Sequence, residues 1–249
     1  MEDHLQVCFV GEDETDTGGL DLLKDIFSMF WEKAFKTYFT GENVFVPFLP
    51  VAKLHEANRI YPFLGRILSL STALHQTIPV RFCRSTLLTL LHSPLEANEE
   101  CLVNDFMNFI TQSERQFLER AVRDYQSLTN SDKEKGKYIF GRFGLGAVIR
   151  EDNTSRIVVN LARQELCIRP SCLCTLMKSG IPKKHMQAFW EILSYTEIND
   201  LYKALLPTNS GVLSLLEANE DLRPQEDAFF YYLRDFIRGL REDELSLFL

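Results

Sequence analysis

Three cysteines and one histidine form the closest grouping of residues that could bind a metal ion or attack a substrate. Cys167, Cys172 and Cys174 follow one another closely, and His185 comes soon after them. Structural zinc sites usually combine two C-x₂₋₄-C pairs, whereas Cys172 and Cys174 are one residue apart and lack a second matching pair. We therefore favour small buried thiols in a helical region, and a zinc site stays the alternative.

A second grouping is acidic and precedes a predicted helix: Glu12, Asp13, Glu14 and Asp16. These carboxylates could hold a hard cation through oxygen ligands. Carboxylates at a helix N-terminus also interact favourably with the helix dipole and accept hydrogen bonds from its free N–H groups. We favour this second role because it needs no ligand.

Gly141, Gly144 and Gly146 superficially resemble a phosphate-binding loop. No Lys-Ser/Thr pair follows them, and their spacing is not that of a dinucleotide-binding loop, so we expect a connection between elements. The five histidines are scattered without an H-E-x-x-H arrangement, and the sequence has no G-x-S-x-G elbow. The residue patterns therefore identify no catalytic residue, no metal ligand set and no cofactor.

Composition and charge limit the possible classes of protein. Of 249 residues, 45% are apolar and 25% are charged, which is typical of a globular chain and excludes a disordered tail or a collagen-like fibre. The net charge of −8 opposes binding to nucleic-acid phosphates. We see no apolar run of the roughly 20 residues that a membrane span needs. The first residues are acidic rather than signal-like, so we expect reduced thiols in an intracellular protein, cytoplasmic and/or nuclear.

Helices are the elements expected to position most of these residues. After a short strand over residues 5–10 and a glycine-rich turn, one long helix carries an apolar stripe at three-and-four spacing. Its many aromatic rings predict a deeply buried central helix. The stripe consists of Leu23, Ile26, Phe27, Phe30, Trp31, Ala34, Phe35 and Tyr38. A short edge strand bounded by prolines should follow over residues 43–50.

The remaining chain also shows mainly helical patterns. A helix is expected over residues 57–75, with Pro62 in its first turn, where a missing N–H costs little. Residues 129–137 contain no apolar side chain and are predicted to form a flexible loop. Further helical patterns cover residues 81–91, 98–128, 157–167, 185–193, 198–205 and 229–248.

Three stretches go beyond generic helix patterning. Residues 7–20 follow V-x-F-x-G-E-x-x-x-D-x-G-G, residues 61–70 approach F-x-x-I/L-G-R-L-L-G-x-A, and residues 229–249 approach F-W-x-x-L-x-x-L-S-E-E-E-L-x-x-F-L. In this order they resemble the larger, N-terminal lobe of HECT-type ubiquitin ligases. Residues 95–228 match that lobe only loosely, and the R-E-F/W run that usually follows the glycine pair is replaced here by residues 20–25.

The resemblance implies a fold and a division of the chain. We expect an α+β protein, predominantly α-helical and HECT N-lobe-like, with a few short strands. Residues 1–239 would form the lobe, including a subdomain at about 165–225 that docks a ubiquitin-conjugating enzyme. Residues 240–249 would begin the connection to a C-terminal lobe absent from this sequence.

The resemblance also implies which half of the ligase chemistry is present. In this family a cysteine within a T-C-F-N stretch of the C-terminal lobe accepts ubiquitin as a thioester and passes it to a substrate lysine. None of the six cysteines stands in such a stretch, so this chain should retain docking of the conjugating enzyme and ubiquitin without the catalytic thiol. The alternative is a non-catalytic protein-interaction module derived from a ligase.

Four leucines are the candidate contacts for the conjugating enzyme. They flank the Pro/Gly turn at residues 207–211 and could form exposed apolar anchors, although simple core packing is an equally open explanation. They are Leu205, Leu206, Leu213 and Leu216.

Overall fold

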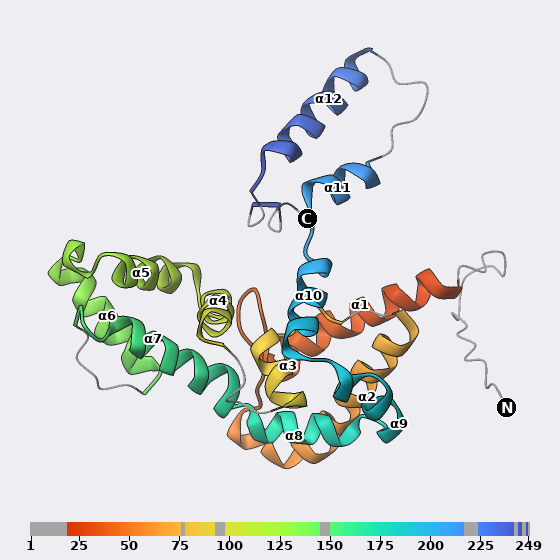
Figure 1. The fold of residues 1–249 in the computed structure, drawn as a ribbon, viewed down its shortest axis with the longest axis horizontal. Helices are drawn as coiled ribbons and strands as arrows, with labels where there is room; N and C mark the ends of the chain where they lie inside the picture. Colours follow the sequence, from red (N-terminus) through yellow and green to blue (C-terminus); the bar gives the residue numbers. More distant parts are fainter. Residues whose placement is uncertain are drawn as a thin grey trace. The chain divides into compact units, whose positions relative to one another are not determined.

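The computed structural model describes residues 19–75, 78–92, 98–144, 150–216, 224–241, 244–245 and 248. Over these residues the chain is predominantly helical with one two-stranded sheet (Figure 1). It divides into two compact units, Met1–Ile198 and Asn199–Leu249. The predicted strand at residues 5–10, the acidic grouping and the glycine signature of residues 7–18 lie outside the described residues. Within the described part, no helix combines the length and the apolar character needed to cross a bilayer.

The helices and strands follow one another along the chain with short connections. In the first unit they are α1 (Gly19–Tyr38), β1 (Phe39–Thr40), β2 (Val46–Pro47), the 3₁₀ helix η1 (Val51–Glu56), α2 (Ala57–His75), α3 (Arg84–Leu91), α4 (Glu99–Phe109), α5 (Gln112–Arg123), the 3₁₀ helix η2 (Tyr125–Ser127), α6 (Asn130–Arg142), α7 (Thr154–Arg163), the π-helix η3 (Gln164–Ile168), α8 (Ser171–Gly180), α9 (Lys183–Ala188) and the 3₁₀ helix η4 (Trp190–Ile192). Helix α10 (Tyr195–Leu205) spans the boundary between the units, and α11 (Asn209–Leu215) and α12 (Pro224–Gly239) belong to the second.

The aromatic stripe of α1 packs as its spacing predicts. Trp31 and Phe35 are buried, with ring centroids 5.6 Å apart. Phe35 also stacks on Phe45 at 5.0 Å, and Phe39 meets Phe82 edge-to-face at 5.8 Å. Such ring pairs add stabilisation beyond the area that they bury. The cluster therefore fixes α1 against the small sheet and the segment that leads into α3.

The sheet is shorter than the predicted edge strand. Strands β1 and β2 pair antiparallel, and only Val46 and Pro47 of residues 43–50 are in β2. Proline has no N–H to donate to a ladder, which limits extension of this strand. Gly41, in the connection, has φ of +140°, and a Cβ there would clash with the carbonyl oxygen of Val44, so the turn requires glycine.

Helices α2 and α8 cross with their backbones in contact. A Cβ on Gly65 would clash with the carbonyl of Met177, and a Cβ on Gly180 would clash with the carbonyl of Pro62. Gly65 belongs to the Leu-Gly-Arg stretch of residues 64–66, so this glycine has a packing role. Pro62 lies inside α2 rather than in its first turn, because the helix already begins at Ala57.

Two other predictions about helix boundaries were wrong. Residues 129–137 do not form a loop but open α6, because Thr129 and Asp132 form a capping box around its first turn. The single segment predicted over residues 98–128 is divided into α4 and α5 by a second capping box, formed by Thr111 and Glu114. In both places a threonine and an acidic residue three positions later start a new helix.

The second unit has a small core between α11 and α12. Val212, Ile237 and Leu245 are buried there, and partly buried leucines pack around them: Leu213, Leu216, Leu233 and Leu240. The Nδ2 group of Asn209 donates to the carbonyl oxygens of Ile237, Arg238 and Leu240 at 2.8, 3.2 and 2.8 Å. Ile237 and Arg238 lie in the last turn of α12, where backbone carbonyls run short of partners within the helix, so this amide side chain caps the end of α12.

Candidate functional site

The four leucines predicted to bind a conjugating enzyme lie in two different environments. Leu213 and Leu216 turn toward the core between α11 and α12, where they pack on the buried residues. Leu206 is 47% exposed and Leu205 is half-buried. The structure therefore makes Leu206 the most accessible of the four. The predicted docking range of residues 165–225 includes parts of both units.

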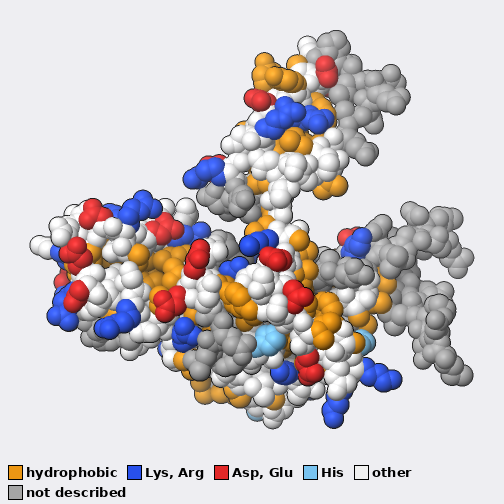
Figure 2. Space-filling view, viewed as in Figure 1, with side chains coloured by type: hydrophobic (Ala, Val, Ile, Leu, Met, Phe, Trp, Pro, Cys, Tyr) orange, Lys and Arg blue, Asp and Glu red, His pale blue; other side chains and the backbone are white. Residues whose placement is uncertain are grey.

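Sequence reasoning missed several exposed apolar residues of the second unit. Leu215 is 81% exposed beside the buried Val212. On α12, Phe229, Tyr232 and Phe236 are also exposed and lie on one side at three-and-four spacing. Hydrophobic side chains are visible on the surface of this unit (Figure 2). The α12 pattern holds two adjacent stripes, one of exposed aromatic residues and one of leucine and isoleucine residues that face the core.

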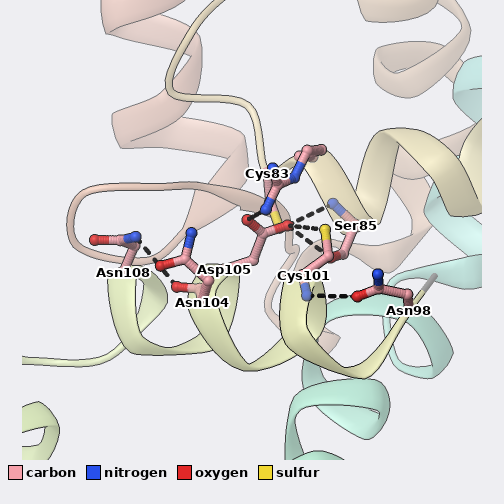
Figure 3. Close-up of polar contacts among 8 residues, drawn as sticks. Cys83, Ser85, Asn98, Cys101, Asn104, Asp105 and Asn108 are labelled. Carbon is pink, nitrogen blue, oxygen red and sulfur yellow. Dashed lines mark hydrogen bonds and ion pairs between the residues drawn. The ribbon is translucent and has the colours of Figure 1, made fainter. Parts of the chain in front are cut away.

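Asp105 is the centre of a buried polar cluster in the first unit (Figure 3). Its side chain comes from α4 and is 6% exposed. Oδ1 accepts from Arg84 Nη2 at 3.0 Å, and Oδ2 accepts from the backbone N–H and the hydroxyl of Ser85 at 2.8 and 2.6 Å. The Cys83 side chain makes no capping hydrogen bond at the start of α3. Asp105 therefore caps α3 from a neighbouring helix, where a negative charge is favourable.

Two thiols complete this cluster without becoming nucleophiles. The Sγ atoms of Cys83 and Cys101 each lie 3.8 Å from Asp105 Oδ2. Burial, and then the charge of Asp105, raise the pKa of both thiols, so they stay protonated and donate to the carboxylate. The Cys167 thiol lies nearby, 3.8 Å from the carbonyl oxygen of Ser85, and burial raises its pKa as well. These contacts describe a structural anchor between α3 and α4.

The residues considered for zinc do not come together. Cys167 and Cys174 are buried, Cys172 is exposed, and His185 Nδ1 lies 2.9 Å from Ser69 Oγ. Within the described ranges, no three His, Cys, Asp or Glu side chains gather in a way that could hold a metal ion. Of the glycine-rich stretch, residues 141–142 end α6, residues 143–144 form the turn after it, where Gly144 has φ of +76°, and residues 145–149 are not described.

A cavity of about 610 Å³ is the other candidate site in the first unit. The β1–β2 hairpin, the C-terminal end of α6 and the junction between η3 and α8 surround it. Its walls are largely apolar, and its polar residues include Arg142, Glu165, Arg169 and Cys172. Sequence reasoning missed this site because its residues come from segments far apart in the chain.

No protein-family model matches this chain, and neither does any curated protein or solved structure. A proposal of function therefore depends on the motif resemblance and on the exposed surface of the second unit.

Proposed function

We propose that this chain is a HECT-type ubiquitin ligase-like domain that docks a ubiquitin-conjugating enzyme for transfer of ubiquitin to protein lysines. The observation that carries the proposal is the order of the three motifs at residues 7–20, 61–70 and 229–249. The close crossing of α2 and α8 supports the proposal. At this crossing the backbone of α8 leaves no room for a side chain at Gly65, which is the glycine of the second motif.

The docking surface in this proposal lies on the second unit. Leu206 and Leu215 expose apolar side chains, and α12 adds Phe229 and Tyr232. Aromatic anchors of this kind often carry much of the free energy of binding at a protein interface. Leu213 and Leu216 would act indirectly, because they hold α11 against α12. Such a docking contact would be small and transient, at or below roughly 1,200 Å² of buried surface.

The proposed contribution of this chain ends at docking. Thioester transfer needs an accessible thiolate, and no cysteine stands in the T-C-F-N setting of the family. Four of the five described cysteines are buried. The missing motif also favours a second candidate function, a protein-interaction module that binds a partner without taking part in ubiquitin transfer.

A titration with a panel of ubiquitin-conjugating enzymes, free and charged with ubiquitin, tests the proposal. We expect at least one of them to bind in the micromolar range. Tyr232→Ala should weaken that binding by about tenfold, as expected for an interface anchor. Tyr138→Ala is the matched control, because Tyr138 is an equally exposed tyrosine on α6 of the other unit.

Two outcomes would count against the proposal in different ways. If no conjugating enzyme binds at high micromolar concentration, docking is wrong and the interaction module becomes the better description. If the chain forms a ubiquitin adduct that a reductant or hydroxylamine removes, the conclusion that it carries no catalytic thiol is wrong.

A further inference from the structure

The exposed aromatic side of α12 has the pattern of a surface that pairs with another helix. Phe229, Tyr232 and Phe236, which we call the aromatic stripe, are 69%, 70% and 54% exposed. Their spacing of three and four residues is that of the seam along which two α-helices pair. At about 200 Å² for each aromatic side chain, roughly 400 Å² of ring surface is accessible. An apolar patch of this size on a soluble protein is often an interaction site.

The small core of the second unit gives a reason for the stripe to be covered. The unit has about 50 residues, and units near this size are marginal in stability unless association or another link adds to the core. Leu233 and Leu240, which pack on that core, follow Phe229 and Phe236 by four residues each. Residues four apart are neighbours on a helix surface, so the stripe borders the core side of α12. A second helix on the stripe would therefore extend this core.

A second copy of α12 matches the stripe in length and in side chains. When two copies run antiparallel, Phe229 of each can lie opposite Phe236 of the other, and the two Tyr232 side chains then meet near the centre. Every ring of the stripe faces another ring in this register, and such ring pairs add stabilisation beyond the area that they bury. The symmetry also makes the contact closed, because the same patch is used on both copies.

The area of this contact indicates a reversible dimer. Two stripes together would remove about 800 Å² of ring surface from water. Residues beside the stripe would add to this value, which brings the total near the lower limit of roughly 1,200 Å² for specific interfaces. We therefore expect association in the micromolar range.

The charges of α12 favour the antiparallel orientation. Glu226 and Asp227 lie in its first turn, and Arg238 lies in its last. In the register described above, Asp227 of one copy is level with Arg238 of the other. A parallel pair would instead set acidic turn beside acidic turn and align the two helix dipoles. By helical spacing Asp227 and Arg238 lie away from the stripe, so they bias the orientation without adding contacts to the seam.

We propose that the aromatic stripe of α12 binds a second copy of this chain, as a symmetric antiparallel helix pair with Phe229 opposite Phe236. The inference uses the exposure, spacing and charges of α12, and it does not depend on the proposed role in ubiquitin transfer. Because the docking surface includes Phe229 and Tyr232, pairing and docking of a conjugating enzyme would exclude each other.

Sedimentation velocity of the 249-residue chain, from low to high micromolar concentration, tests the proposal without any conjugating enzyme. The average mass should rise with concentration from that of one chain toward that of two. Tyr231→Glu is the matched control, because Tyr231 is an exposed tyrosine of the same helix that lies off the stripe. This variant should associate as strongly as the unchanged chain.

Two charge variants test the register. Phe229→Glu and Phe236→Lys, each alone, should weaken association by at least about tenfold, because each places an unpaired charge at the centre of the contact. In a mixture of the two, the introduced glutamate lies opposite the introduced lysine, and the remaining Phe236 and Phe229 still meet. The mixture should recover most of the lost affinity. Thermal melts check that each variant folds. If one does not, Phe229→Lys and Phe236→Glu form the equivalent pair.

Four results would overturn the proposal. A mass of one chain at every concentration would assign the stripe to a different protein partner or to contacts within the chain. Assemblies larger than two copies would mean that the contact is not closed. An equal loss of association in Tyr231→Glu would place the contact elsewhere on α12. Failure of the mixture to associate more strongly than either variant alone would refute the antiparallel register.

Discussion

Helices α2 and α8 in the first unit pack very differently from helices α11 and α12 in the second. The α2–α8 crossing brings the backbones into contact at Gly65 and Gly180, and α2 carries the almost completely buried Tyr61, Leu64 and Leu68. The α11–α12 pair buries few side chains, and α12 leaves several aromatic rings exposed.

This contrast indicates different roles for the two units: the first stabilises the fold, and the second exposes a surface that a partner can contact. A large core contributes most of the free energy of folding, and regions with few buried apolar contacts open more easily. The first unit is therefore expected to hold most of the stability of the chain. The second unit keeps its aromatic surface exposed, which suits a docking role better than a core role. Four experiments test this contrast, from the largest expected effect to the smallest.

Gly65→Ala should cause the largest loss of stability. The added methyl group would clash with the carbonyl of Met177, and separating the two helices should lower the free energy of unfolding by about 3 kcal/mol. Urea denaturation followed by circular dichroism measures this change. Gly141→Ala is the control, because a Cβ there meets no described residue within 4 Å, and the change should leave stability unchanged or raise it by up to about 1 kcal/mol. Equal midpoints for the two variants would show that the crossing is not tight.

Asp105→Asn should have the second-largest effect. It removes the charge that pairs with Arg84 and caps α3, so we expect a loss of about 2 kcal/mol in the free energy of unfolding. Glu134→Gln removes a carboxylate from the exposed pair with Lys137, and it should change stability by less than about 0.5 kcal/mol. If both variants unfold at the same urea concentration, the Asp105 cluster does not anchor α3.

Asn209→Ala should act within the second unit alone. It removes the amide that caps α12, which should lower the local stability of that helix by about 1 kcal/mol. Hydrogen exchange followed by mass spectrometry should therefore become faster in residues 224–239 and stay unchanged in residues 57–75. Ser210→Ala, at the neighbouring exposed position, is the control. Faster exchange in α2 would mean that the two units do not open independently.

The smallest expected effect concerns how the free energy of unfolding depends on pH. The contributions of Glu165 and Glu244 to this dependence should have opposite signs. Burial raises the pKa of Glu165 above its ordinary value of 4.5, so the neutral carboxyl group is favoured by folding. The stability that it contributes is present below pH 4.5 and is lost as the pH rises through the folded-state pKa. The difference in unfolding free energy between the unchanged chain and Glu165→Gln should therefore fall as the pH rises above this value.

Glu244 in the second unit should show the reverse. Hydrogen bonds from the backbone and then the side chain of Arg241 lower the pKa of Glu244, so its contribution is present above pH 4.5 and is lost on acidification. Urea midpoints of Glu165→Gln and Glu244→Gln measured over the same pH series check both signs. Parallel slopes would contradict the contrast between the buried and the exposed carboxyl group.

Local sequence patterns predicted some of these features and could not predict others. Helix periodicity correctly located the buried face of α1, because the spacing of its apolar residues is a property of that segment alone. The polar run at residues 129–137 led to the wrong prediction of a loop. The capping box formed by Thr129 and Asp132 favours a helix there even though the run contains no apolar residue. The need for glycine at position 65 comes from the carbonyl of Met177, which lies in another helix, so the sequence of α2 alone does not contain it.

The candidate sites depend even more on tertiary contacts. Asp105 becomes a helix cap only when α4 meets α3, and neither segment contains that information by itself. The cavity needs residues from the β1–β2 hairpin, α6 and α8. For the leucines near residues 207–211, the sequence placed apolar residues beside a turn but could not tell which of them face the core. Their role in docking stays a prediction.

The amide of Asn209 also sets an order of events during synthesis of the chain. Its acceptor carbonyls belong to residues 237, 238 and 240, about thirty positions downstream. Until residues 237–240 have been synthesised, the Asn209 amide lacks this set of acceptors and α12 lacks this C-terminal cap. The second unit must therefore be completed late in translation, after the helices of the first unit have already emerged.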